Sequence, residues 1–529
     1  MEKAEENRPS PGAVSEKQSF SDLEYQRDRL FDQDPELLKA VSCFATKIRS
    51  CPPDPKCPEI EPRALLVGGF VRDALLGKHP KDADMEVYGV SVERLESILD
   101  QLFGDKVTKA GKAFKVFKVN IAPGIDFDVS IPRRDSKTGK KQNEFETEGN
   151  PSMSIEAAAK RRDFTFNSMA ADILSGEVYD PYAGIKDLEN KILRITDEKQ
   201  FQEDPLRVYR AVQFISRMEC AAEPKTFSLL KEMVKRGDLD YLPKERITEE
   251  LKKLFLKSEK PSLGLEFARS LGIIEKYYPE LNALVGTPQE PEWHPEGDVW
   301  THTMMAVDAA ENISRESERE FTEEEMLEVL IGTLCHDFGK PDTTEVLDGR
   351  VRSLGHEKAG IKPSKEFLGR LSFGESVEKA TAAIAANHLK PSAHYRSKTE
   401  GKITEKQYVN ILRKLLRKIS PVSWRVLIAA SESDSRGRTF SDALTKEYSV
   451  GKLFKEAILA ENLDVASKKQ LIQGKDIIEV AERLGLKIKP GPKFGEAIRT
   501  IEAERDDGKI STREEALLKL EKILKNIAV

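Results

Sequence analysis

Two aspartates separated by one residue, Asp82 and Asp84 in KDADMEV, have the spacing that says most about chemistry. In an extended strand, residues i and i+2 point to the same side, so both carboxylates would face one spot. Hard divalent cations prefer such oxygen ligands, and Mg²⁺ is commonly held by one or two carboxylates together with substrate phosphates. The spacing therefore predicts a magnesium site built for phosphates. An acidic loop without a metal is the alternative.

The segment before the aspartates, LVGGFVRDALLG, predicts a site for those phosphates. Gly68 and Gly69 allow a tight turn from the apolar strand 64–67 into a helix, whose free amides and dipole attract anions. Arg72 lies one turn into that helix and can pair with the oxygens of a triphosphate. Strand, glycine turn, arginine-bearing helix and acidic strand together predict one nucleotide pocket.

A third carboxylate is predicted in GIDFDVSIPRRD, where apolar residues alternate with Asp126, Asp128 and Ser130. This is strand periodicity with the acids on one face. Two-metal phosphoryl transfer commonly needs another carboxylate near the attacking hydroxyl. We favour Asp128 for this role, with Asp126 as the alternative. A half-exposed strand with solvated acids remains the other interpretation.

Next along the chain, KRRDFTFNSMA places two arginines before an acid. Asp163 could cap a following helix, while Arg161 or Arg162 faces the nucleotide. The sequence does not decide between the two arginines.

The run FQEDPLRVYRAVQF predicts a helix that distinguishes bases. Asp204 lies near its N-terminus, Pro205 is tolerated in the first turn, and Arg207 lies one turn from Asp204 on one face, which Arg210 extends. A carboxylate accepts from an exocyclic amine while a guanidinium donates to a ring nitrogen, so the pair suits cytosine or adenine. The alternative is an intrahelical salt bridge, which contributes only a few tenths of a kcal/mol.

These motifs resemble, in order, those of the class II tRNA nucleotidyltransferases, or CCA-adding enzymes, and of the related bacterial poly(A) polymerases. The resemblance extends from about Ala64 to near the C-terminus. It implies an α+β fold, with a DNA polymerase beta-like head followed by an all-α neck, an HD domain and a helical tail. It also implies roles for Asp82 and Asp84 in holding Mg²⁺, for Gly69 and Arg72 in contacting the triphosphate, and for Asp204, Arg207 and Arg210 in selecting CTP or ATP.

The same resemblance predicts the reaction. The stretch AGKAFKVFKV is similar to one in CCA-adding enzymes, whereas poly(A) polymerases tend to carry a more basic segment with a histidine. We therefore expect template-independent addition of CMP, CMP and AMP to the acceptor end of tRNA from CTP and ATP. The alternatives are a CC-adding enzyme, an A-adding enzyme and a poly(A) polymerase.

Histidines and carboxylates from separated helices suit a divalent transition metal with positions open to water. Their order, H, HD and D, resembles the HD phosphohydrolase superfamily. The resemblance implies metal ligands at His302, His336, Asp337 and Asp434, with His356 and His388 lining a phosphate pocket or binding a second metal. It implies phosphatase, 2′-nucleotidase and 2′,3′-cyclic phosphodiesterase activities. A merely structural metal is the alternative, and a rival hypothesis is that hydrolysis dominates while the head is inactive.

Composition places the chain among soluble proteins: 39% of its 529 residues are hydrophobic and 33% are charged. No run has the length of a membrane span and no apolar signal core begins the chain, so we expect no membrane contact and a cytoplasmic location. Five scattered cysteines do not form a disulfide framework. The net charge of −6 means that RNA must be bound by local basic clusters, at residues 109–118, 413–418 or 487–493.

We expect five segments along the chain. They are an N-terminal extension and linker (1–62), the catalytic head (63–196), a helical, nucleotide-selecting and RNA-binding neck (197–286), the HD domain (287–449) and a C-terminal helical tail (450–529). The oligomeric state is left open.

Overall fold

The computed structural model describes residues 22–80, 82–110, 116–137, 145–316, 320–439, 447–463, 471–486, 491–506, 509–510 and 512–527. The chain divides into two compact units, residues 1–247 and residues 248–529, and the proposed neck is shared between them. The beginning of the predicted N-terminal extension (1–21), the middle of the stretch AGKAFKVFKV (111–115) and most of the basic cluster 487–493 (487–490) lie outside the described residues.

The core of the first unit is a seven-stranded mixed sheet with the order β3-β4-β5-β2-β1-β8-β9. Strands β2 and β5 are parallel, and the other neighbours are antiparallel. The strands are β1 (Arg63–Val67), β2 (Asp82–Tyr88), β3 (Val107–Ala110), β4 (Val116–Ala122), β5 (Ile125–Ser130), β8 (Ala170–Ala171) and β9 (Val178–Tyr179). With the helices that follow, this sheet confirms the predicted α+β class.

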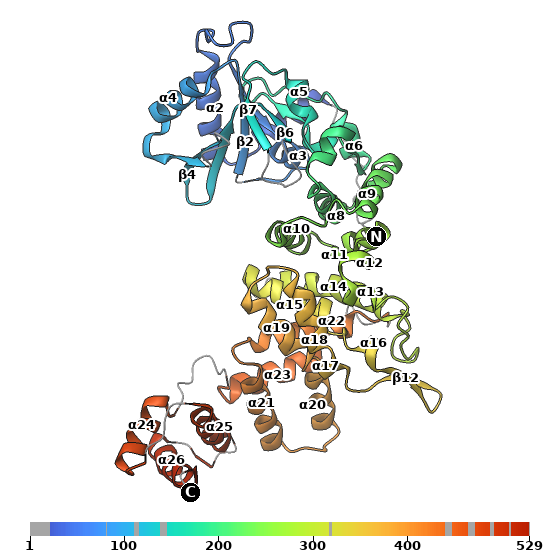
Figure 1. Ribbon diagram of the computed structural model, residues 1–529, viewed down its shortest axis with the longest axis vertical. Coiled ribbons are helices and arrows are strands. Elements are labelled where there is room, and N and C mark those ends of the chain that lie inside the picture. Colours follow the sequence, from blue (N-terminus) through green and yellow to red (C-terminus); the bar gives the residue numbers. More distant parts are fainter. Residues whose placement is uncertain are drawn as a thin grey trace, which may run out of the picture. The chain divides into compact units, whose positions relative to one another are not determined.

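Helices α2 (Pro35–Arg49) and α4 (Val92–Phe103) cover one face of this sheet, and on the opposite face α5 (Ile155–Lys160) packs on Leu65, Val67 and Tyr88 beside the acids. Phe127 of β5 packs against Phe44 of α2 and Phe103 of α4, with ring centroids 6.0 and 5.6 Å apart. These two helices therefore lie on the side to which Phe127 points (Figure 1). Because neighbouring strand residues point to opposite faces, the flanking aspartates of β5 point away from them.

The segment before β1 contributes to the core of the head. Helix α1 (Leu23–Phe31) is followed by α2, whose N-terminus is capped by the Asp34 carboxylate. Apolar residues of α2 are buried against the sheet, among them Leu37, Val41 and Ile48. The sequence assigned this segment to an extension and linker, whereas α2 packs as part of the head because its apolar face covers the strands.

The rest of the first unit is mostly helical. Its further elements are α3 (Gly69–Leu75), the hairpin β6 (Arg133–Lys137) and β7 (Phe145–Gly149), α5 (Ile155–Lys160), α6 (Gly184–Glu189), β10 (Ile192–Leu193), α7 (Glu198–Glu203), α8 (Arg207–Met218), β11 (Ala221–Ala222) and α9 (Pro224–Arg236). Phe214 of α8 packs edge-to-face on Phe164 and Phe166, which fixes α8 beside the segment that follows Arg162. Helix α10 (Lys244–Lys257) crosses from one unit to the other.

The second unit is built from helices around a core formed by α14, α15, α19 and α22. Its helices are α11 (Pro261–Ser270), α12 (Ile273–Tyr277), α13 (Pro279–Asn282), α14 (Val299–Arg315), α15 (Glu323–Cys335), α16 (Lys340–Thr343), α17 (His356–Ala359), α18 (Ile361–Gly369), α19 (Glu375–Ala385), α20 (Lys390–Thr399), α21 (Glu405–Ile419), α22 (Trp424–Arg436), α23 (Ser449–Ala460), α24 (Gly474–Arg483), α25 (Pro492–Asp506) and α26 (Arg513–Ile527). Among the described residues, no helix combines the length and apolarity needed to cross a membrane.

One hairpin interrupts the helices of the second unit. Strands β12 (Thr344–Leu347) and β13 (Arg350–Ser353) pair antiparallel around Asp348 and Gly349, both of which have positive φ. The sequence predicted almost wholly helical structure here. The Asp-Gly pair is a strong signal for a two-residue hairpin turn and could have revealed it.

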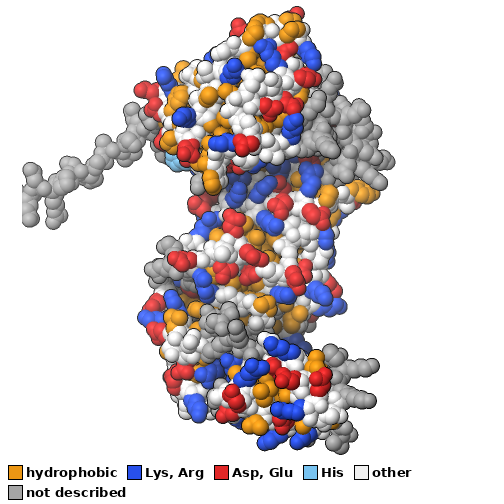
Figure 2. Space-filling view, turned by 90° about the vertical axis from the view of Figure 1, so that its left-hand side faces the viewer, with side chains coloured by type: hydrophobic (Ala, Val, Ile, Leu, Met, Phe, Trp, Pro, Cys, Tyr) orange, Lys and Arg blue, Asp and Glu red, His pale blue; other side chains and the backbone are white. Residues whose placement is uncertain are grey.

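Charges of both signs are interspersed over the face of the molecule drawn in Figure 2. Lys and Arg alternate there with Asp and Glu, and hydrophobic side chains are scattered between them (Figure 2). This mixture agrees with the small net charge of −6.

Candidate functional site

The acidic face of the head gathers the carboxylates that the sequence singled out. The parallel register of β2 and β5 places Asp82 beside Asp126 and Asp84 beside Asp128. Side chains at the same register of adjacent strands point to the same side of a sheet, so all four share one face. This is the face opposite α2 and α4. The structure therefore brings the predicted trio Asp82, Asp84 and Asp128 together.

Asp126 and Asp128 differ in their contacts. The Asp126 carboxylate is paired with Lys118, whose Nζ lies 2.9 Å from its Oδ1. In contrast, Oδ1 of Asp128 is buried and makes no hydrogen bond among the described residues. An unpaired buried carboxylate oxygen is costly unless a cation reaches it. This geometry fits a divalent cation and favours Asp128 as the third carboxylate.

Desolvation and mutual repulsion raise the pKa values of two of these carboxylates. The pKa of Asp84 is raised, first by desolvation and then by the carboxylates of Asp128 and Asp82. The pKa of Asp128 is raised by desolvation, with Lys118 opposing and Asp126 and Asp82 adding to the shift. Carboxylates with raised pKa values favour a neutralising partner, which Mg²⁺ would supply.

The glycine turn identifies which arginine lies nearest the acids. Gly68 has a φ of 69°, and a Cβ added to it would meet Nη1 of Arg162 at 2.7 Å. The charge of the same guanidinium opposes the rise in the pKa of Asp84. Arg162 therefore lies between the turn and the acidic face. Arg161 instead donates to Glu86 and offers its backbone carbonyl to α8.

Glu86 is a residue of this site that the sequence analysis missed. Its side chain is buried on β2, and its Oε1 lies 2.7 Å from Nη2 of Arg161 and 3.0 Å from Nη2 of Arg162. Burial would raise the pKa of Glu86, but the two arginines outweigh it and hold that pKa below its usual range. The signal was present, because the alternation that joins Asp82 to Asp84 continues to Glu86.

The sequence predicted that Arg72 contacts the triphosphate, but in the structure its side chain is buried and contacts other residues of the protein. Its side chain is 4% exposed, its Nε and Nη2 donate to Asp73 at 2.8 and 2.7 Å, and it also donates to Asn167. Its guanidinium lies 5.1 Å from the ring centroid of Phe214 on α8. In the described structure Arg72 ties α3 to its neighbours, while its contact with a nucleotide stays a prediction. Gly69 begins α3 beside this guanidinium.

Asp163 does not cap a following helix. Only a 3₁₀ turn follows, Thr165–Asn167, and it has no side-chain cap. The Asp163 carboxylate is buried and accepts from Nε of Arg210 at 2.7 Å and from Nδ2 of Asn167 at 2.9 Å. The long-range pairing with α8 prevails because a buried charge needs a counter-charge more than a short turn needs a cap.

The residues predicted to select the base lie at the start of α8, beside Arg161 and Arg162. Asp204 is in extended backbone two residues before the Leu206 N-cap, and its Oδ2 lies 3.2 Å from Nη2 of Arg246. Arg207 donates to the carbonyl oxygens of Gln200 and Arg161, at 2.7 and 2.6 Å. The structure thus brings Asp204, Arg207 and the Arg161 backbone into one neighbourhood. Base selection by them stays a prediction.

The second unit holds a separate, buried cluster of histidines and acids. His302 lies on α14, the His336–Asp337 pair follows α15, and Asp434 lies on α22. Two more histidines join them from α17 and from the end of α19. All six side chains are buried: His302, His336, Asp337, His356, His388 and Asp434.

The distances in this cluster suit a shared metal ion. Nε2 of His302 lies 3.1 Å from Oδ1 of Asp434, and Nε2 of His336 lies 3.1 Å from Oδ2 of Asp337. Nε2 of His388 lies 3.9 Å from Oδ1 of Asp337. Among the described residues, three groups of possible ligands have their donor atoms within 4.8 Å of one another: His302, His336 and Asp434; His336, Asp337 and His388; and His294, Glu296 and His302.

The polar atoms of the cluster fit a divalent cation. Oδ1 of Asp337 is buried and makes no hydrogen bond among the described residues, while Oδ2 is paired with Nζ of Lys340 and lies 3.1 Å from Nε2 of His336. The Nδ1 atoms of His336 and His356 lie 2.6 and 2.7 Å from backbone carbonyls, which leaves their Nε2 atoms facing inward. Burial would raise the pKa of Asp337, yet the interactions with His336 and Lys340 outweigh it and hold that pKa well below its usual range.

A pocket of about 440 Å³ opens onto this cluster. Three cationic side chains line it: Lys340, Arg396 and Arg438. Nζ of Lys340 lies 2.6 Å from Oδ2 of Asp337, and Nη2 of Arg438 lies 3.5 Å from Oδ1 of Asp434. Cations beside a metal site suit a phosphate group.

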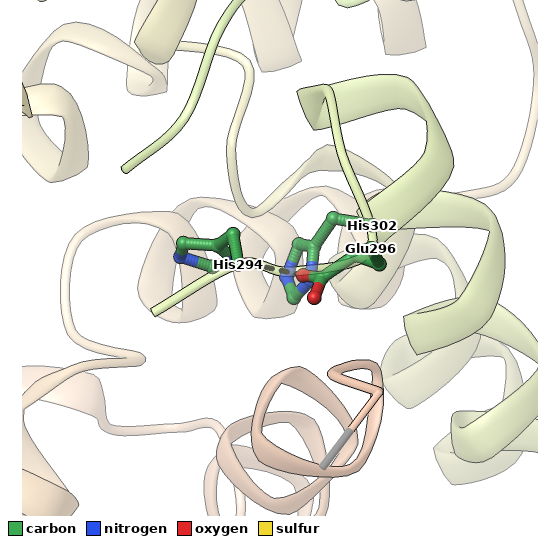
Figure 3. Close-up of side chains that lie close together, drawn as sticks. All are labelled: His294, Glu296 and His302. Atoms are coloured by element: carbon green, nitrogen blue, oxygen red, sulfur yellow. Dashed lines mark hydrogen bonds and ion pairs between the residues drawn. The ribbon is translucent and has the colours of Figure 1, made fainter. Parts of the chain in front are cut away.

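The sequence analysis gave no role to His294 and Glu296. Oε1 of Glu296 lies 2.8 Å from Nδ1 of His294 and 2.8 Å from Nδ1 of His302, between the two rings (Figure 3). Their spacing before the first metal-ligand histidine was visible in WHPEGDVWTHT, but the loop geometry that joins them was not.

Three family models match the chain. They describe the poly A polymerase head domain (residues 64–194), a probable RNA and SrmB-binding site of polymerase A (221–284) and an HD domain (299–417). The HD match ends before Asp434, which the structure nevertheless places beside His302.

Two relatives with similar sequences are named multifunctional CCA proteins, and a solved structure with a similar fold is a CCA-adding enzyme. The chain is 32% identical over 378 residues to the multifunctional CCA protein of Actinobacillus pleuropneumoniae serotype 5b, which covers 70% of this chain and 85% of the relative. It is 34% identical over 329 residues to the multifunctional CCA protein of Xanthomonas campestris pv. campestris strain B100, covering 61% and 74%. A solved CCA-adding enzyme with ATP shares the fold, with a TM-score of 0.55, 20% identity and coverage of 96% and 99%.

Proposed function

This chain belongs to the family of the multifunctional CCA proteins, and on that basis we propose that it adds CMP, CMP and AMP to the 3′ end of tRNA, from CTP and ATP and without a nucleic-acid template. The register of β2 and β5 carries this proposal, because it places Asp82, Asp84 and Asp128 on one face of the sheet. The acceptor end of tRNA is the partner. Such a substrate is consistent with a cytoplasmic location.

In the proposed reaction, the 3′ hydroxyl oxygen of the RNA attacks the α-phosphorus of the nucleotide and pyrophosphate leaves. Asp82 and Asp84 would hold Mg²⁺, which supplies charge neutralisation for the triphosphate. Asp128 accepts the proton of the attacking hydroxyl, and its unpaired Oδ1 is the atom available for it. Arg162, beside the glycine turn, faces the phosphates, and Glu86 holds this arginine in place.

The base is selected by protein groups at the start of α8. Asp204 can accept from the exocyclic amine of cytosine or adenine, and Arg207 can donate to the adjacent ring nitrogen. Arg210, paired with Asp163, fixes the angle of this helix relative to the segment that carries Arg161. Uracil and guanine present the opposite donor and acceptor pattern on that edge, so UTP and GTP are rejected.

The experiment that tests this function incubates tRNA lacking its last three nucleotides with labelled CTP and ATP. Growth by three residues, CMP before AMP, is the expected product. Growth by two residues indicates CC addition, by one residue A addition, and a long ladder indicates a poly(A) polymerase. Absence of any incorporation contradicts the proposal.

The buried histidine cluster favours a second function, metal-dependent hydrolysis of phosphate esters. Here His302, His336, Asp337 and Asp434 would hold a divalent transition metal, which polarises a phosphate oxygen when bound. His356 and His388 line the same pocket, and Lys340 and Arg438 bring positive charge to a substrate phosphate.

Assays with 2′-nucleotides, 2′,3′-cyclic nucleotides and p-nitrophenyl phosphate, in the presence of Ni²⁺, Co²⁺ or Mn²⁺, test the second function. We expect hydrolysis that chelation removes and metal restores. Metal binding without hydrolysis of any of these substrates would instead indicate a structural metal.

A further inference from the structure

Glu296 contacts the metal site and its pocket at the same time. Its side chain is 0% exposed, and its single Oε1 lies 2.8 Å from an Nδ1 atom of each of two imidazoles, His294 and His302. Its other oxygen, Oε2, is buried and makes no hydrogen bond among the described residues. The residue lies in the loop before α14, so this contact does not follow from helical spacing.

An ionised carboxylate only accepts hydrogen bonds, so both Nδ1 atoms must donate. In the neutral ring of His302 this leaves the lone pair on Nε2, which lies 3.1 Å from Oδ1 of Asp434. Two acceptor atoms at that distance repel each other unless a cation or proton lies between them. The arrangement therefore prepares both atoms to bind one metal ion.

The same argument applies to His294. Its Nδ1 donates to Glu296, so Nε2 carries the lone pair and is an acceptor. The side chain is 12% exposed and lines the pocket together with Lys340 and Arg438. The pocket thus offers three cations for a phosphate, Lys340, Arg396 and Arg438, and beside them the acceptor Nε2 of His294. A substrate that matches it carries a hydroxyl donor next to its phosphate ester.

We propose that Glu296 is a positioning residue that orients His302 toward the metal and His294 toward the substrate, and that Nε2 of His294 accepts a hydrogen bond from a hydroxyl neighbouring the substrate phosphate. The part that concerns His294 rests on the proposed hydrolase function. The part that concerns His302 can be tested by metal binding alone.

Glu296→Gln tests the positioning. The glutamine side chain has the same size as glutamate. It is neutral, so it replaces the charged oxygen that accepts from both imidazoles with a weaker acceptor. We expect the affinity of the full chain for Co²⁺, measured by titration calorimetry and by the absorption of bound Co²⁺, to fall about 10- to 100-fold. Glu292→Gln is the matched control, because it makes the same change in the same loop on a side chain that is 54% exposed. It leaves the affinity unchanged.

His294→Asn tests the acceptor. The asparagine amide retains a donor near the Nδ1 position but removes Nε2. We expect unchanged Co²⁺ affinity, a raised KM for a ribonucleotide with a hydroxyl beside its phosphate, and an unchanged KM for p-nitrophenyl phosphate, which lacks that hydroxyl. Equal effects on both substrates would overturn the acceptor role.

Three results separate failure of this proposal from failure of the hydrolase function. Co²⁺ affinity of Glu296→Gln within twofold of the parent overturns the positioning role. A parent that binds Co²⁺ but hydrolyses nothing overturns the hydrolase function and the role of His294, while a weakened Glu296→Gln still supports positioning.

If Glu296→Gln also loses CTP incorporation and is misfolded, Glu296→Asp replaces it. Its shorter carboxylate cannot reach both rings, so unchanged affinity there overturns the proposal.

Discussion

At the scale of single residues, the pairing of Asp126 with Lys118 distinguishes Asp126 from Asp128, although both are aspartates of one strand. Asp126 already has a counter-charge, whereas Asp128 keeps one buried oxygen without a hydrogen bond among the described residues. The two acids share a strand and a face, so they form a natural pair of test and control.

Asp128→Asn should lower kcat for CTP incorporation by about 10²- to 10⁴-fold, the range that loss of a general base produces. Asp126→Asn should leave kcat largely unchanged, because its carboxylate is neutralised by Lys118. Single-turnover incorporation into tRNA lacking its end measures both. Equal losses in the two variants would contradict the assignment of Asp128.

The raised pKa values of Asp84 and Asp128 predict a link between pH and magnesium. A raised pKa means that protons are held to a higher pH than by a free aspartate, so they compete with Mg²⁺ over a wider acidic range. We expect the Mg²⁺ concentration for half-maximal incorporation to increase as pH falls below neutrality. A requirement that stays constant until the ordinary aspartate range would contradict this.

At the scale of elements, close contacts between loops hold the metal ligands of the second unit in place. A Cβ added to Gly339 would lie 2.1 Å from the carbonyl oxygen of His356 and 2.5 Å from the amide nitrogen of Gly360. Gly339 follows Asp337 by two residues, and these backbone atoms cannot move aside as a flexible side chain could. The loops that carry Asp337 and His356 therefore depend on this glycine for their approach.

Gly339→Ala should separate these two loops and lower the hydrolytic turnover by about 10²-fold, the effect of a misplacement near 1 Å. CTP incorporation should be unaffected. Gly369→Ala is the matched control, since a Cβ there meets no atom within 4 Å. Metal-dependent hydrolysis and incorporation by the same preparations provide the measurement.

Strands and their faces were predictable because period-two alternation is local, and Asp82, Asp84 and Asp128 were found in this way. The register of β2 against β5 was not, because pairing between distant strands leaves no trace in either segment. The contact of Asp163 with Arg210 was missed for the same reason, as it spans 47 positions. Glu86 was missed although its alternation was visible.

At the scale of the whole molecule, the two proposed activities reside in different compact units. The acidic sheet face lies within residues 1–247, and the histidine cluster lies within residues 248–529. Neither site takes a described ligand residue from the other unit.

Reciprocal variants should therefore separate the activities in the full chain. Asp82→Ala should abolish CTP incorporation and retain hydrolysis. Asp434→Ala should do the reverse, because it removes a carboxylate beside His302. Both activities are measured on one preparation of each variant. Retained incorporation by Asp82→Ala would refute the magnesium assignment, and joint loss in both variants would show that the sites are coupled.

Trp293, half-exposed on the pocket wall, has an optical consequence. The chain has three tryptophans, at positions 293, 300 and 424, and all of them belong to the second unit. Indole fluorescence therefore arises from that unit alone, and the first unit is silent under excitation selective for indole. Metal or phosphate entering the histidine pocket can thus be followed by emission, undisturbed by nucleotide bound to the acidic sheet.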